Sequence, residues 1–199
     1  MSSSLVGSEM CIRDSGGSAR IENSEVHQNH SPDPAGFTIA RFAVGAFDTR
    51  LELIRTNVSN NTGGGVVGTA SGGVTGHVSL LVEDSVVSQN TESGITVATG
   101  SARIDRSEIS YNQGSGVRTG NDVTLTMRDS TISNNKSTSS TSTGGGVAIV
   151  VGTGSPVTTL INNTISENEA ATGGGIRHAM GTLNSVSYTH LTLPTMMSV

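Results

Sequence analysis

A nine-residue phrase of apolar and polar positions recurs six times along the chain. It opens on an apolar residue, usually has Ser or Thr fourth, places Val or Ile sixth and closes on Asn. Successive closing Asn residues are 32, 29, 22, 23 and 33 positions apart, and periods of this length indicate a repeat architecture. The six copies are Ile21–Asn29, Leu53–Asn61, Val82–Asn90, Ile104–Asn112, Met127–Asn135 and Leu160–Asn168.

Each repeat is predicted to form three short strands. In the third repeat, Val78–Val82 largely alternates apolar and polar residues, as a half-buried strand does, and Val86–Ser88 and Ile95–Val97 supply two more strands. Twenty-two residues fit three strands of four or five residues plus turns. No helical period recurs, and Gly, Ser, Thr and Asn are poor helix formers. We therefore predict an all-β fold, a right-handed parallel β-helix solenoid of about six to seven coils, truncated at both ends.

Stacked coils place equivalent residues in columns about 4.8 Å apart. Three apolar columns should fill the interior, and the closing Asn residues should form a hydrogen-bonded ladder at a turn. Residues beyond the minimal coil are expected in projecting loops at Lys136–Gly145 and Ala40–Arg50. The apolar columns are Val26, Val58, Val87, Ile109, Ile132, Ile165; Ile21, Leu53, Val82, Ile104, Met127, Leu160; and Phe37, Val66, Ile95, Val117, Val147, Ile176. The structural ladder is Asn29, Asn61, Asn90, Asn112, Asn135 and Asn168.

The two ends of the chain carry a different signal. The stretches LVGSEMCIRDS (Leu5–Ser15) and VSYTHLTLPT (Val186–Thr195) back-translate to sequences that resemble the two arms of a transposase-type sequencing adapter. We therefore expect residues 1–15 and 185–199 to be adapter-derived rather than native, and residues 16–184 to be one β-helix fragment.

Composition narrows the function classes. Without the first stretch the chain keeps 10 basic and 14 acidic side chains, a net charge of −4. A mildly acidic chain without basic clusters is a poor partner for nucleic acid, and no segment approaches the roughly 18 apolar residues of a membrane span. The single cysteine, Cys11, lies in the first stretch, so disulfides are not expected to stabilise the fragment.

The nearest candidate for chemistry is a column of charged residues on successive repeats, Asp84, Arg106 and Asp129. A polysaccharide lyase or glycosidase would need such carboxylates and a basic residue. Mixed signs favour a second interpretation, a solvated ion-pair ladder on one exposed patch. The flanking charges expected on this patch are Glu83, Asp105 and Arg128.

No cofactor or metal site is predicted. The native histidines, His27, His30, His77 and His178, lack metal-ligand spacing, and Arg106 interrupts the acidic column where calcium would want converging oxygens. The glycine triplets lack the Lys-Ser/Thr ending of a phosphate loop and recur with the coil, so they are interpreted as turns.

The alternation of [Val/Ile]-Ser-x-Asn with Gly-Gly-Gly-[Val/Ile] resembles the β-helix repeats of bacterial surface and secreted proteins. It is also similar to the repeats of polymorphic outer-membrane proteins and autotransporter passengers, although Val or Ile stands where the former have Phe. The resemblance implies a non-catalytic, adhesin-like stalk or passenger located outside the cell or on its surface. An extracellular glycan or a host or cell surface would be the partner. The same scaffold also carries polysaccharide lyases and glycoside hydrolases, so the enzyme alternative stays open.

Overall fold

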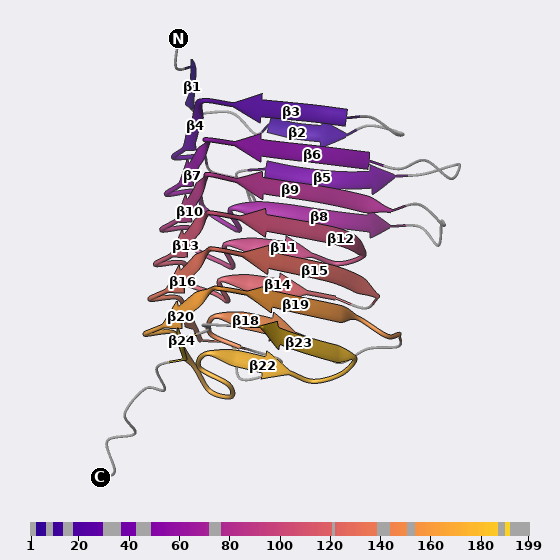
Figure 1. Cartoon of the computed structure of the whole chain (residues 1–199). Helices are drawn as coiled ribbons and strands as arrows, with labels where there is room; N and C mark the ends of the chain where they lie inside the picture. The colour runs from indigo at the N-terminus through magenta and orange to yellow at the C-terminus, as the bar shows by residue number, and fades with distance from the viewer. Residues whose placement is uncertain are drawn as a thin grey trace.

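The chain folds as a stack of coils whose strands form three parallel sheets that run the length of the molecule (Figure 1). The computed structural model describes residues 3–6, 10–13, 18–29, 37–42, 49–71, 77–120, 122–138, 144–150, 154–186 and 190–191. No helix occurs among them. Each strand pairs in parallel with the equivalent strands of the coils before and after it, which confirms the predicted parallel β-helix.

The three sheets take their strands in rotation as the chain winds. Sheet C contains β3 (Ser18–Glu22), β6 (Thr49–Ile54), β9 (Val78–Glu83), β12 (Gly100–Asp105), β15 (Val123–Arg128), β19 (Val157–Ile161) and β23 (Thr182–Val186). Sheet A contains β1 (Ser3–Val6), β4 (Ser24–His27), β7 (Asn57–Ser59), β10 (Val86–Ser88), β13 (Glu108–Ser110), β16 (Thr131–Ser133), β20 (Thr164–Ser166) and β24 (His190–Leu191). Sheet B contains β2 (Met10–Arg13), β5 (Phe37–Phe42), β8 (Val66–Ser71), β11 (Ile95–Val97), β14 (Val117–Thr119), β18 (Val147–Ile149) and β22 (Ile176–His178).

The register of these strands confirms all three predicted apolar columns. Val87 pairs with Val58 and Ile109, Ile104 pairs with Val82 and Met127, and the third column is paired in the same way from Phe37 to Ile176. Most of their described side chains are fully buried in one continuous cluster. Burial of this apolar surface, with strands alternating between inward and outward side chains, holds the sheets together.

Both predicted loops include residues that belong to strands, while residues 43–48 and 139–143 of these loops lie outside the described residues. Strand β5 already includes Ala40–Phe42, and β6 begins at Thr49, which shortens the predicted Ala40–Arg50 loop from both sides. Lys136–Ser137 is likewise not loop but strand β17, which pairs with β21 (Glu169–Ala170) in a small separate sheet. The chain continues in the same direction after Asn135 and after Asn168, so the backbones of these two repeats pair before their extra residues begin.

The two terminal stretches also contribute strands. Strand β1 pairs with β4 and β2 with β5, and at the other end β24 pairs with β20, so the solenoid continues into both stretches. Pairing of this kind does not test where the stretches come from, and their adapter origin stays a prediction.

A column of glycines lies beside the asparagine ladder, at the start of sheet B. A Cβ built on Gly116 would lie 2.6 Å from Ile132 Cγ2 and 2.9 Å from Asn135 Nδ2. Gly65, Gly94 and Gly146 meet their own neighbours in the same way. Close approach to the core and ladder, rather than an unusual φ, therefore requires glycine at this position in each coil.

Candidate functional site

The asparagine ladder is formed as predicted and is buried. From Asn29 to Asn168, each Asn Nδ2 donates to Oδ1 of the next ladder residue at 2.9–3.0 Å. The backbone N–H of each donates to the same oxygen at 3.0–3.1 Å. The second Nδ2 hydrogen reaches a backbone carbonyl, such as that of Val87 for Asn112. The ladder therefore satisfies the backbone at a turn that strand pairing leaves open, and its role is structural.

A second ladder accompanies it at the turn between sheets C and A. Its Ser and Thr members each donate a hydroxyl to the backbone carbonyl two residues earlier, as Ser85 does to Glu83 at 2.7 Å. Asn163 instead donates its Nδ2 hydrogen to the Met127 carbonyl of the coil before, at 3.0 Å. Members of both kinds accept the N–H of the coil before, as Ser107 Oγ does from Ser85 at 3.1 Å. The recurring Ser or Thr is visible in the repeat, but its hydrogen bonds to the neighbouring coil are not. The column consists of Ser24, Thr56, Ser85, Ser107, Ser130 and Asn163.

Immediately before this second ladder, one residue in each coil adopts a left-handed conformation, with φ between 46° and 52°. Such values are uncommon for residues other than glycine and here turn the chain sharply from sheet C into sheet A. The turn pushes the side chain outward. The predicted candidates Asp84, Arg106 and Asp129 all occupy this position. With Asn23, Arg55 and Asn162 they form what we call the turn column.

The three candidates line one depression, but they are not bonded to one another as a single set. Arg106 Nε donates to Asp84 Oδ1 at 2.8 Å, and its Nη2 also pairs with Glu83. Asp129 instead accepts a hydrogen bond from Asn162 Nδ2 at 2.5 Å. The three residues line a shallow depression of about 500 Å³ with Ser85, Glu108 and Thr131. The arrangement has the form of an ion-pair ladder on an exposed surface, where solvent screens each pair and its contribution to stability is small.

The hydrogen bond from Arg106 lowers the pKa of the Asp84 carboxyl below its ordinary value, and the nearby positive charge adds to this. Because the folded pKa is depressed, the pair stabilises the fold at neutral pH, and this contribution is lost as the pH falls through the folded pKa. We expect Arg106→Ala to raise the pKa of Asp84 toward the ordinary value of an aspartate side chain, measured by NMR titration.

Arg118→Ala is the matched control for that titration, because Arg118 is exposed on sheet B and has no contact with Asp84. It should leave the Asp84 titration unchanged. Equal shifts in the two variants would mean that the long-range charge, and not the hydrogen bond, sets the pKa.

One flanking residue departs from the prediction of a single exposed patch. Asp105 is buried, with a side chain only 3% exposed, while Arg128 on the next strand is exposed. Arg103, two residues earlier on the same face of β12, folds back onto Asp105 and pairs with it at 2.5 Å. The prediction that Asp105 shares the exposed patch is therefore wrong.

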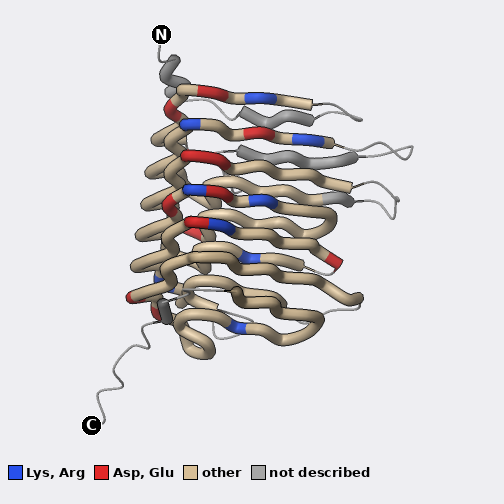
Figure 2. Tube along the Cα trace, viewed as in Figure 1, with Lys and Arg blue, Asp and Glu red and all other residues tan. Residues whose placement is uncertain are grey.

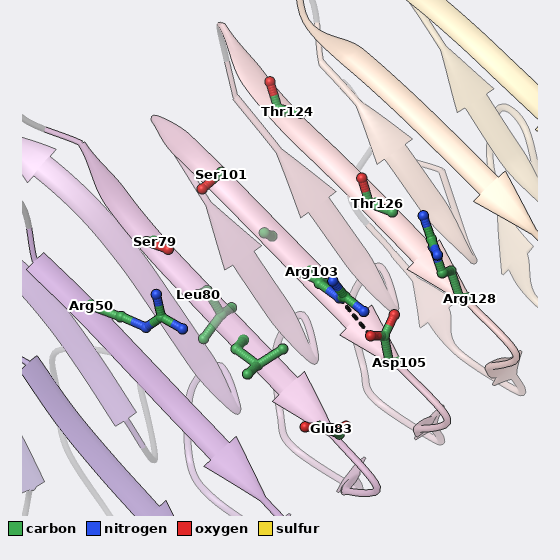
Figure 3. Close-up of a pocket in the computed structure, with 12 residues that line it drawn as sticks. Arg50, Ser79, Leu80, Glu83, Ser101, Arg103, Asp105, Thr124, Thr126 and Arg128 are labelled. Carbon is green, nitrogen blue, oxygen red and sulfur yellow. Dashed lines mark hydrogen bonds and ion pairs between the residues drawn. The ribbon is translucent and has the colours of Figure 1, made fainter.

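The larger concavity lies beside this ion pair, on the outer face of sheet C (Figure 3). It has a volume of about 550 Å³ and crosses four strands, β6, β9, β12 and β15. We call it the sheet C groove. Its lining residues are Arg50, Ser79, Leu80, Leu81, Glu83, Ser101, Ala102, Arg103, Asp105, Thr124, Thr126 and Arg128. The repeat pattern does not reveal this groove, because its depth depends on which outward side chains are short.

In the part of the chain that the structure describes, no group of three or more His, Cys, Asp or Glu side chains could hold a metal ion. His30 lies outside the described residues. None of the described elements is a helix long and apolar enough to cross a membrane.

Coil stacking, paired parallel sheets and two turn ladders define the class of protein, a parallel β-helix repeat protein. The family described as right handed beta helix region matches residues 4–163 and, in an overlapping second match, residues 73–191, and the chain belongs to this family. No curated protein and no solved structure matches the chain.

Proposed function

We propose that the chain is a non-catalytic, adhesin-like stalk or passenger segment of a secreted or cell-surface bacterial protein. One observation carries the proposal. The turn column, with the residue types of a lyase, is bonded to itself: Arg106 is held by Asp84 and Glu83, and Asp129 by Asn162. A basic residue engaged by two carboxylates is poorly placed to take a proton from a substrate. The repeating ladders, by contrast, suit a rigid spacer.

The alternative is a polysaccharide lyase or glycoside hydrolase acting on an extracellular glycan. It is favoured by the depression around Asp84, Arg106 and Asp129, which could receive a sugar unit. A lyase would use Arg106 as the base and the two carboxylates to orient the substrate.

Measuring the turnover of acidic glycans distinguishes the non-catalytic segment from the enzyme. The full chain, incubated with polygalacturonate and with alginate, should release neither unsaturated products, followed by ultraviolet absorbance, nor new reducing ends. Activity that is present in the wild type and abolished in Arg106→Ala would establish the enzyme and reject the stalk. Arg118→Ala serves as control, since it removes an exposed arginine from another sheet.

A further inference from the structure

Two arginines on the outer face of sheet B share one column of side chains. Strand register places Arg118 beside Ala148 and Ala148 beside Arg177, on three consecutive coils. All three side chains face outward, because each residue directly follows a member of the third interior column. Two coil steps, roughly 10 Å, separate the Cα atoms of the two arginines. Their guanidinium groups can therefore reach one ligand from opposite sides.

Neither arginine has an anionic partner among the described residues. The arginines of β3, β6 and β12 and both arginines of the turn column pair with carboxylates. Arg118 and Arg177 take part in no ion pair with the part of the chain that the structure describes. Figure 2 shows charges of both signs interleaved on the N-terminal coils of sheet C, whereas β14 and β22 carry an arginine without an acidic residue. The column is therefore a local excess of positive charge on an acidic chain.

Arg177 is the more enclosed of the two arginines. Its Nη1 atom is buried and has no hydrogen-bond partner. The base of its side chain lies against two glycine turns, since a Cβ built on Gly144 or on Gly173 would lie 3.0 or 2.9 Å from the Arg177 Cβ. Ala148, between the arginines, has only a methyl group and offers no acceptor. A buried cationic donor without an acceptor is costly, and a bound anion would remove that cost.

We infer that Arg118 and Arg177 form a binding site for a phosphate group, carried by the free ion or by a phosphate monoester. A tetrahedral oxyanion presents oxygens on all sides, so it accepts hydrogen bonds from two guanidinium groups that approach from opposite directions. The two oxygens of a carboxylate, by contrast, face a single guanidinium fork. Thr96, the next residue of the column beside Arg118, adds a hydroxyl at the edge of the site. The inference goes beyond the proposed function and does not depend on it.

Titration of the full chain with inorganic phosphate tests the site. The side-chain Nε–H signals of Arg118 and Arg177 in proton–nitrogen correlation NMR spectra should shift along one saturating curve. Acetate, the carboxylate probe, should bind at least about fivefold more weakly. The affinity for phosphate should fall at least about fivefold between about 20 and about 500 mM sodium chloride, because salt screens the attraction.

Methyl phosphate distinguishes the two sources of the phosphate group. A monoester that binds at least as tightly as the free ion indicates a phosphorylated ligand, because the site then leaves room for the ester group. Tighter binding of inorganic phosphate indicates the free ion.

Four variants locate the site. Arg118→Ala and Arg177→Ala should each weaken phosphate binding at least about tenfold. Arg177→Lys keeps the charge but loses the planar fork, so it should weaken binding at least about threefold. Arg128→Ala is the matched control, because Arg128 is also exposed and outside every ion pair of the described residues but lines the sheet C groove. It should change the affinity less than about twofold.

Circular dichroism confirms that each variant is folded. Arg118→Ala removes only an exposed side chain, so its result stands whatever the fold of Arg177→Ala. Three results would overturn the inference: no shift of either Nε–H signal at about 20 mM phosphate, equal binding of acetate and phosphate, or equal losses in Arg128→Ala and the two sheet B alanine variants.

Turnover of a glycan bears on the proposed function alone, and phosphate binding bears on this site alone. The site lies on another sheet from Asp84. Arg118→Ala therefore remains the control for the Asp84 titration and for the turnover assay, both run in phosphate-free buffer.

Discussion

Replacing Ile132 with aspartate is expected to unfold the coils around β16. Ile132 is fully buried in the interior column, between Ile109 and Ile165. The substituted carboxylate has no partner in this apolar interior, so the free energy of unfolding should fall by at least about 4 kcal/mol. Coils of a solenoid are stabilised by their neighbours, so the loss should spread beyond one repeat. Chemical denaturation followed by circular dichroism measures it.

Thr131→Asp is the control, because Thr131 precedes Ile132 in the same strand and is exposed. Its free energy of unfolding should stay within about 0.5 kcal/mol of wild type. Similar losses in the two variants would contradict the assignment of inward and outward faces, and with it the predicted register.

Replacing Asn112 with alanine is expected to have the second largest effect. The change removes the acceptor used by the N–H and Nδ2 of Asn90, at 3.1 and 2.9 Å. It also removes the donor to Asn135 and to the Val87 carbonyl. Several buried polar groups lose a partner at once, and the free energy of unfolding should fall by about 2–5 kcal/mol.

Asn57→Ala provides the comparison for this variant, since Asn57 is an exposed asparagine on β7. Its midpoint of denaturation should remain close to that of wild type. If Asn112→Ala were equally mild, the asparagine ladder would be a consequence of coil stacking rather than a source of its stability.

The spacing of the six repeats and the residue type at each repeat position together predicted the interior columns and the asparagine ladder. They were sufficient because every coil repeats the same apolar position, so one alignment of the repeats sets the register of all three sheets. The loop boundaries were less predictable. Residues beyond the minimal coil, such as Lys136 and Ser137, still form strand where two neighbouring coils leave the ladder in the same direction.

The candidate site was predicted less well, for physical reasons. The turn column contains Asn, Arg and Asp, residues with no shared preference strong enough to reveal a left-handed turn. The burial of Asp105 depends on Arg103 folding over it, a contact between side chains that an alternating pattern does not contain. Equivalent outward positions thus acquire different environments according to the side chains beside them, on the same strand as well as on neighbouring coils.

The asparagine ladder is also directional. From Asn61 to Asn135, each amide donates to the ladder oxygen of the following coil and accepts from the ladder amide of the preceding one, so each of these junctions repeats the same set of bonds. A coil added or removed as a unit leaves both new neighbours able to form that junction. The number of coils is consequently a quantity that gene duplication can change without redesigning the core, and the reach of such a protein can be adjusted in steps of one repeat.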